Sequence, residues 1–588
     1  MDGIHRLLRN VTKEEITRPT GEEDVLIGFE YTGFHPQTEQ SSEHLLLLKN
    51  RFGKCIGGTH PQIKETNERH ELNSVPVLHS TSSTVEDFYN IENLGIECSP
   101  RCGGCKCRKC SVGSKNYTIK EEKELALIEK NPHYDQEAKR WIAEYPWIRD
   151  PKDLPDNKKA AFAKFISAER RLAKNSEPAK VYKEQIQDMV NRGVARKLTK
   201  TELRNNKGSI HYISHHEVLK PDSKSTPVRI VFNSSEKYMG HVLNEYWAKG
   251  PDLLNNILVV LLRFREYEVA FIGDIKKMYH TVATNVLDQH TYRFLWRDME
   301  TTQEPDIYVI QRVSFGDKPS GAIATVALRK TAEMGKDQFP EASQVILNNT
   351  YMDNIIDSVN NRTKAKQITD DIEKLLNKGG FKLKEWTYSE DRSSRHEPKI
   401  PMEPSTATEK VLGVIWDPTT DNFHYKVKLS LSPKKKTTRT HKDANPANVQ
   451  PTYSVPEVLT KRMILSQVNS IYDPLGLAGP YTVRAKILMR KLWTYETKLD
   501  WDDPIPEEYG REWMTFFDDL PEMEKITVKR CLKPHNAIGD AILIIFSDGS
   551  NNAYDACAYV RWELSTREFV SYIILSEESP SSSQKDVN

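Results

Sequence analysis

The stretch that decides the fold is NNTYMDNIIDSV, residues 348–359. An aromatic residue and Met352 lead directly into Asp353, and apolar residues lie on both sides of it. This pattern predicts a buried β-hairpin with Asp353 and Asn354 at its turn. A carboxylate at the tip of an apolar hairpin is a candidate site residue, although an Asp after an apolar run is most often an ordinary turn or cap.

A second carboxylate ends another apolar strand. VAFIGDIKKMYHTV, residues 269–282, predicts a strand that ends at Asp274 and continues into a short helix. If both strands belong to one sheet, Asp274 and Asp353 converge. Paired carboxylates offer the hard oxygen ligands that Mg²⁺ prefers. Two such ions about 4 Å apart stabilise the attacking and leaving oxygens of nucleotide transfer.

Composition sets wide bounds on the function. The chain has 588 residues, enough for roughly three or four domains. Charged residues make up 28% and the mean hydropathy is −0.63. A net charge of +1 neither supports nor excludes a nucleic-acid partner, because such a partner needs basic grooves rather than a basic total. No apolar run approaches the roughly 18 residues of a membrane span, and the N-terminus lacks a signal-peptide core. We therefore expect an intracellular, cytoplasmic protein with no membrane partner.

The remaining patterns alternate between helical and extended. Apolar residues at three- and four-residue spacing predict helices over 156–174 and 178–198, and TKAKQITDDIEKLLNKGG predicts an amphipathic helix that ends at glycine. Residues 208–235 and 411–429 predict hairpins, and residues 541–575 predict three strands. The run ILVVLL at 257–262 has the length of either a strand or a core helix. Residues 430–455 form a basic loop that could contact a template backbone or be a solvated insert.

Taken in order, these segments resemble the pol polyprotein of Pao/BEL long-terminal-repeat retrotransposons. STPVRIVFNSS through VAFIGDIKKMYHTV is similar to the fingers and first palm motif of its reverse transcriptase, and TYMDNIIDSV occupies the place of the aromatic-x-Asp-Asp box. SIYDPLGLAGPYTVRAKILMRKLW resembles the segment after the polymerase that is labelled a Pao retrotransposon peptidase. DVLIGFEY with NRFGKCIGG resembles the end of a retropepsin-like domain.

The resemblance implies an α+β fold: a right-hand polymerase of fingers, palm and connection, with a partial retropepsin-like tail and a truncated RNase H-like piece. The expected domains are a retropepsin-like remnant at 1–60, a linker with a Cys cluster at 61–120, fingers and palm at 121–425, a connection of Pao-peptidase type at 426–535, and an RNase H-like start at 536–588. Its implied partners are an RNA or DNA template with primer and deoxynucleoside triphosphates.

The family's site residues carry over by position. Asp274 and Asp353 would bind Mg²⁺ or Mn²⁺, and the ring of Tyr279 would exclude a ribose 2′-hydroxyl. A guanidinium fork suits phosphate oxygens, which is the role implied for Arg229. The other implied positions are Gly316, Lys318 and Ser320 beneath the nucleotide and template, Lys384 near the leaving phosphate, and Leu412 and Gly413 as the primer grip. Tyr279 as core, Arg229 as a surface ion pair and Lys384 as a solvated side chain are the alternatives.

Asn354 departs from the family pattern, which has a second Asp there. An amide keeps one ligating oxygen but loses a full charge, and loss of an essential metal ligand costs about a thousandfold or more in rate. Asp357 is not expected to substitute for it, since the hairpin aims that residue elsewhere. Two functions remain open: an impaired RNA-directed DNA polymerase, or a catalytically inactive nucleic-acid-binding relic.

Two further sites are candidates. Five of the eight cysteines lie in CSPRCGGCKCRKC, residues 98–110, where Cys102, Cys105, Cys107 and Cys110 form two C-x-x-C pairs. These pairs could bind Zn²⁺, or they could be redox or unliganded thiols. The resemblance makes Asp548 the first carboxylate of the RNase H-like part, without RNase H activity expected from this sequence. An aspartic peptidase is the least favoured function, because no Asp-Thr-Gly or Asp-Ser-Gly occurs.

Overall fold

The computed structural model divides the chain into two compact units: Met1–Arg101 with Ser111–Gly113, and the remainder. The residues that the structure describes are 37–42, 45–50, 53–58, 117–219, 228–390, 409–427, 458–493 and 499–580. The first unit contributes an antiparallel sheet of β1 (Gln37–Ser42), β2 (Leu45–Asn50) and β3 (Gly53–Gly58). The strand expected over 24–31 and the cysteine cluster lie outside the described residues.

A four-stranded antiparallel sheet in the second unit carries the predicted hairpin. Its strand order is β15 (Thr350–Tyr351), β16 (Asn354–Val359), β11 (Val269–Asp274) and β17 (Thr387–Tyr388). Successive side chains of a strand face opposite sides. Accordingly, Phe271 and Ile355 enter one hydrophobic core, while Ala270, Ile272 and Ile356 enter another. The strand β11 therefore contributes to two cores at once.

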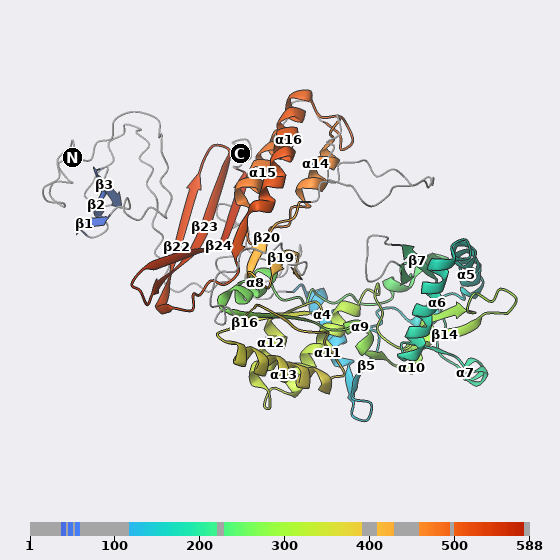
Figure 1. Ribbon diagram of the computed structural model, residues 1–588. Helices are drawn as coiled ribbons and strands as arrows, with labels where there is room; N and C mark the ends of the chain where they lie inside the picture. The colour runs from blue at the N-terminus through green and yellow to red at the C-terminus, as the bar shows by residue number, and fades with distance from the viewer. Residues whose placement is uncertain are drawn as a thin grey trace. The chain divides into compact units, whose positions relative to one another are not determined.

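Helices cover both faces of this sheet. On one side lie α11 (Ser320–Met334), α12 (Pro340–Asn348) and α13 (Arg362–Lys378), and on the other lies α8 (Ile257–Glu266) (Figure 1). The run ILVVLL thus forms a helix, which begins where the Asn256 side chain accepts hydrogen bonds from the Leu258 and Val259 amides. That cap satisfies donors that a helix start would otherwise leave unpaired.

A second group of elements surrounds an aromatic core that includes Tyr182, Trp247 and Trp296. Its helices and strands include α5 (Lys158–Leu172), α6 (Ser176–Asn191), β6 (Ala195–Lys197), β7 (His215–Leu219), β8 (Val228–Phe232), β13 (Arg293–Trp296) and β14 (Asp306–Ile310). The predicted 208–235 hairpin is confirmed as β7 paired with β8. The shorter or flanking elements are α4 (Ile119–Lys130), β4 (His133–Asp135), β5 (Arg140–Ala143), α7 (Lys200–Asn205), β9 (Lys237–Tyr238), β10 (His241–Val242), α9 (Met278–Thr281), β12 (Ala283–Thr284) and α10 (Val286–Gln289).

The C-terminal part combines three helices with two sheets. One sheet has the order β18 (Glu409–Val411), β19 (Val414–Asp417), β20 (Asn422–His424) and β21 (Thr527–Lys529). The helices are α14 (Lys461–Val468), α15 (Gly479–Trp493) and α16 (Glu507–Asp519). The three predicted strands after residue 536 are confirmed as the antiparallel sheet β22 (Ala537–Gly549), β23 (Ala553–Leu564) and β24 (Phe569–Pro580).

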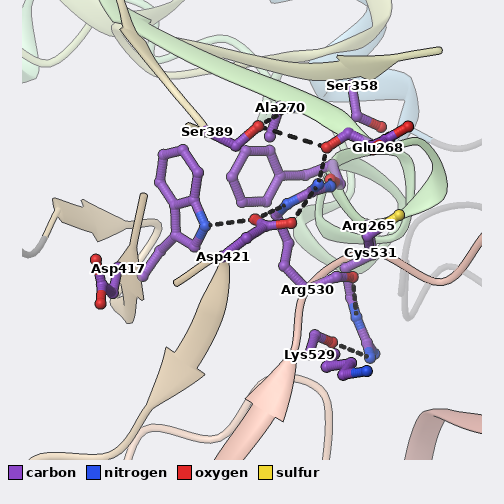
Figure 2. Close-up of polar contacts among 12 residues, drawn as sticks. Arg265, Glu268, Ala270, Ser358, Ser389, Asp417, Asp421, Lys529, Arg530 and Cys531 are labelled. Atoms are coloured by element: carbon purple, nitrogen blue, oxygen red, sulfur yellow. Dashed lines mark hydrogen bonds and ion pairs between the residues drawn. The ribbon is translucent and has the colours of Figure 1, made fainter. Parts of the chain in front are cut away.

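Buried arginines join these strands to α8 (Figure 2). The guanidinium of Arg530, fully buried, donates to both carboxylate oxygens of Asp421 and to the carbonyls of Phe264, Tyr267 and Glu268. Asp421 also accepts from the Trp416 indole at 3.0 Å. Removing one partner of such a pair leaves an uncompensated buried charge.

Arg265 makes a second set of hydrogen bonds between these elements, and its acceptors are main-chain carbonyls. Its guanidinium donates to the carbonyls of Lys529, Arg530, Ile573 and Ile574, which belong to β21, to the residue after it and to β24. Burial and the neighbouring charge of Arg530 lower the pKa of Arg265 to about 10, which leaves it protonated at neutral pH. This side chain therefore connects α8 with two strands distant in sequence.

The loop before α15 docks closely on β24. Gly476 has a φ of +66°, and a Cβ at this position would lie 1.6 Å from the Ser576 carbonyl oxygen. The Ser576 amide in turn donates to the Leu475 carbonyl at 3.0 Å. A glycine is required here, because any side chain would collide with backbone.

Candidate active site

The hairpin turn places Asp353 at the end of the sheet. Tyr351 pairs with Asn354, which leaves Met352 and Asp353 as the two turn residues. Met352 has a φ of +55°, a left-handed conformation that non-glycine residues adopt at some cost. Asp353 is half-buried and Met352 is exposed.

The structure brings Asp274 to the same place. Asp274 lies opposite Asn354 in the β11–β16 register, and the Ile275 amide donates to the Asp353 carbonyl at 2.6 Å. Burial raises the pKa of Asp353, and the negative charge of Asp274 raises it further. The two carboxylates are therefore neighbours in a partly desolvated site, as the strand pattern predicts.

Asn354 places a neutral amide at the position where the family pattern has a second Asp. Its Nδ2 donates to Asp353 Oδ1 at 3.3 Å, and the side chain is partly buried. The neutral amide does not compensate the charge of Asp353. An Asp at position 354 would instead add a third carboxylate beside Asp274 and Asp353. Asp357 lies opposite Phe271 in the β11–β16 register, in the middle of β11 and three residues from Asp274, and burial raises its pKa to about 6.

Lys384 comes from the segment that follows α13. Its amide donates to the Asp274 carbonyl at 2.8 Å, and its Nζ donates to Asp274 Oδ2 at 3.0 Å. The side chain is 58% exposed, so the ion pair is weak in stability terms. It nevertheless brings a cation onto a predicted metal-binding carboxylate.

Tyr279 lies beside this group on α9. Burial and then the charge of Asp353 raise the pKa of Tyr279. Its ring centroid is 4.5 Å from that of Phe315, and its hydroxyl is 3.9 Å from where a Cβ on Gly321 would stand. Phe315, 54% exposed, packs on Tyr279 and was not predicted from the sequence. Its position directly before Gly316 was the available signal.

The FGDKPSG loop is organised by hydrogen bonds to the protein itself. Gly316 has a φ of +95°, and its carbonyl accepts from the Asn244 side chain. The Lys318 ammonium donates to the Trp247 carbonyl at 3.0 Å, and the buried Ser320 hydroxyl donates to the Ser314 carbonyl at 2.6 Å. In this structure Lys318 and Ser320 hold the loop in place, and their predicted contacts with nucleotide and template stay predictions.

A buried carboxylate anchors the same loop. Asp317 accepts from the hydroxyls of Tyr145 and Tyr292 at 2.6 Å each, and from the Ser234 hydroxyl. Burial raises its pKa to about 6, against the effect of these three donors. Asp317 was not predicted, because its partners come from residues 234, 145 and 292.

The remaining predicted positions lie on other elements. Arg229 is exposed on β8, opposite Val218, in the separate β7–β8 sheet. Leu412 and Gly413, with φ of +49° and +96°, form the turn between β18 and β19. Asp548 is exposed on β22, where it lies opposite Asp555.

The oxygen donors at the hairpin fit a hard divalent cation. Asp274 and Asp353 present carboxylates and Asn354 an amide oxygen. Burial is the main cause of the raised pKa of Asp353, and the negative charge of Asp274 adds to it, so a bound cation would relieve both effects. Within the described part of the chain, no group of three or more His, Cys, Asp or Glu side chains is arranged as a metal site. Mg²⁺ needs fewer protein ligands, since it keeps several waters.

Comparison with protein families identifies the C-terminal part. Residues 460–587 match the Pao retrotransposon-like RNaseH-like domain. This match supports an origin in a Pao retrotransposon polyprotein and a function related to nucleic acid. It crosses the expected boundary at 535/536, and its description names an RNaseH-like domain where a peptidase-type connection was expected. No curated protein matches the chain. Among the described residues, no helix has the length and apolar character needed to cross a bilayer.

Proposed function

We propose that the chain contains a reverse-transcriptase-type polymerase module, in which fingers, palm and connection bind a primer–template and a deoxynucleoside triphosphate. The observation that carries this proposal is the convergence of Asp274 and Asp353 at one end of one sheet, with Tyr279 beside them. The nucleic-acid relationship of residues 460–587 supports the same proposal. We also propose that residues 1–60 are the C-terminal remnant of a retropepsin-like domain.

In this function Asp274 and Asp353 hold Mg²⁺ or Mn²⁺. The bound ions supply charge stabilisation for the attacking and leaving oxygens. The Tyr279 ring limits the space beside the incoming sugar, and its contact with the Phe315 ring restricts its movement. Lys384 can exchange Asp274 for a phosphate oxygen, because its ion pair is exposed. Arg229 provides a guanidinium fork for the triphosphate.

Asn354 weakens the chemistry. It leaves the site one negative charge short of the paired-Asp arrangement, at the point where cations must be held. A missing essential ligand costs about a thousandfold or more in rate. We therefore propose slow nucleotidyl transfer by the natural sequence.

The test is primer extension by the full chain and by Asn354→Asp, with Mg²⁺ and with Mn²⁺. Asn354→Asp is expected to extend at least about a hundredfold faster, since a metal ligand is restored. Asp353→Asn in the Asn354→Asp background should abolish this gain. Asp357→Asn, on the same hairpin but away from the site, is the matched control and should keep it. Equal, vigorous synthesis by the natural sequence and Asn354→Asp would contradict the proposed impairment.

A second candidate function is binding of nucleic acid without synthesis. It is favoured by two contacts that satisfy the carboxylates with the protein's own groups: Lys384 on Asp274 and Asn354 on Asp353. Under this alternative, primer–template binds in a salt-dependent manner while Asn354→Asp still gives no extension.

A further inference from the structure

Tyr472 lies against the turn of the β18–β19 hairpin. A Cβ built on Gly413 would stand 2.4 Å from Cε1 and 2.6 Å from Cδ1 of the Tyr472 ring. Only a glycine at position 413 therefore lets the ring pack on this turn. Tyr472 is nevertheless 46% exposed as a residue, so part of it remains open to solvent.

The loop that carries Tyr472 is held firmly. Asp473 accepts from the Leu477 and Ala478 amides at 3.0 and 2.6 Å, and from the Tyr425 hydroxyl at 3.0 Å. Three residues later, Gly476 packs on the backbone of β24. An exposed aromatic ring on a backbone that is fixed directly after it is a typical contact residue, because little conformational entropy is lost when a partner binds.

The same ring belongs to a segment that packs on the sheet of the carboxylate site. Leu412, the neighbour of Gly413, and Leu475, in the loop that carries Tyr472, lie in the same hydrophobic core as Ile356 of β16. Burial raises the pKa of Tyr472, and the nearby phenol of Tyr351 raises it further. The β18–β19 turn and the Tyr472 loop thus pack against the sheet whose β15–β16 turn carries Asp353.

We propose that Tyr472 is a positioning residue for the 3′-terminal nucleotide of the primer, with its exposed ring face against that nucleotide and its other face on Gly413. The proposal rests on the polymerase function proposed above. Aromatic rings pack on nucleotides whatever the base, and each such contact contributes measurably to binding. Tyr472 belongs to the segment that matches the RNaseH-like domain, so this segment completes the polymerase site.

The experiment compares the full chain with Tyr472→Ala, Tyr472→Phe and Tyr554→Ala. Tyr554 is also an exposed tyrosine, at 55%, but it lies on β23 and serves as the control. The probe is a primer–template with 2-aminopurine either at the primer 3′ terminus or several nucleotides upstream. Binding is followed by anisotropy, and the terminal environment by 2-aminopurine fluorescence.

Tyr472→Ala is expected to bind about tenfold more weakly, within the range of one lost aromatic–nucleotide contact. It should also lose the protein-induced fluorescence change at the terminal 2-aminopurine while keeping the change at the upstream one. Tyr472→Phe and Tyr554→Ala should behave like the parent. A merely structural role would alter both probe positions together.

The outcomes separate this inference from the function on which it rests. If the parent binds primer–template and Tyr472→Ala reports the same terminal signal, the inference is wrong and the polymerase proposal stands. Loss of both probe signals in a Tyr472→Ala protein with a lowered melting temperature also counts against it. If the parent does not bind primer–template at all, the proposed function itself fails.

Discussion

Breaking the buried Asp421–Arg530 pair tests how the β18–β21 sheet is fastened to α8. In Asp421→Ala, Arg530 keeps three carbonyl acceptors but loses both carboxylate oxygens, and it remains fully buried. Loss of one partner of a buried, hydrogen-bonded ion pair costs about 3–5 kcal/mol. The indole of Trp416 loses its acceptor as well. The local opening free energy of this region should fall by that amount.

Hydrogen exchange measured by mass spectrometry reads out this cost locally, which suits a chain of several domains. The Arg530 amide donates to the Asp421 carbonyl at 3.1 Å, so peptides that cover β20 and β21 report on the joint. Their protection should decrease by roughly two to three and a half orders of magnitude, since about 1.4 kcal/mol corresponds to a factor of ten.

The matched control is Asp519→Ala, which breaks the exposed Arg484–Asp519 pair at 2.8 Å. Exposed pairs contribute about 0–1 kcal/mol, so protection there should change by at most about fivefold. The double variant Asp421→Leu/Arg530→Met should recover part of the loss, because no unpaired charge remains. Protection in Asp421→Ala within the range of the control would refute this account of the joint.

Three further outcomes follow from burial and close packing. Burial lowers the pKa of His215 to about 4, below its unfolded value of about 6.5. The neutral imidazole therefore contributes stability above pH 6.5 that is lost as pH falls toward 4. The melting temperature of His215→Gln should depend less on pH between 4 and 6.5. Asp317 has the opposite sign: its folded pKa of about 6 lies above its ordinary value of 3.8. Stability therefore falls as pH rises from 4 to 6, and Asp317→Asn should remove this dependence. Gly476→Ala should lower the free energy of unfolding by about 3 kcal/mol or more, because its Cβ would collide with the Ser576 carbonyl. Gly510→Ala, on a helix with open space around it, should be neutral or stabilising. Equal melting temperatures for the two glycine variants would contradict this.

Local patterns predicted the elements that frame the site. Alternating and apolar runs gave β11, the β15–β16 hairpin and α13, because their periodicity follows from facing a core on fixed sides. The run at 257–262 stayed ambiguous, since a helix buried on most sides has no polar face to reveal its period. Its Asn256 cap was the local signal that favours a helix.

Residues whose roles depend on tertiary contacts could not be predicted in this way. Phe315 meets Tyr279, and Tyr472 meets the Gly413 turn, only after separate segments pack together, and nothing in their immediate neighbours signals these contacts. The same holds for Asp421 and Arg530, which are 109 residues apart. Asp274 and Asp353 could be predicted because each lies at the end of its own apolar strand, and a shared sheet brings strand ends together.

The guanidinium of Arg265 donates hydrogen bonds to four carbonyl oxygens and, among the residues that the structure describes, to no side chain. Carbonyls are the same for every amino acid, so β24 can exchange Ile573 and Ile574 for other strand-forming residues without loss of this tie. Substitutions along β24 can therefore accumulate in evolution without weakening its hydrogen bonds to Arg265. A lysine in place of Arg265 would lack the planar array of donors and could not span the two strands.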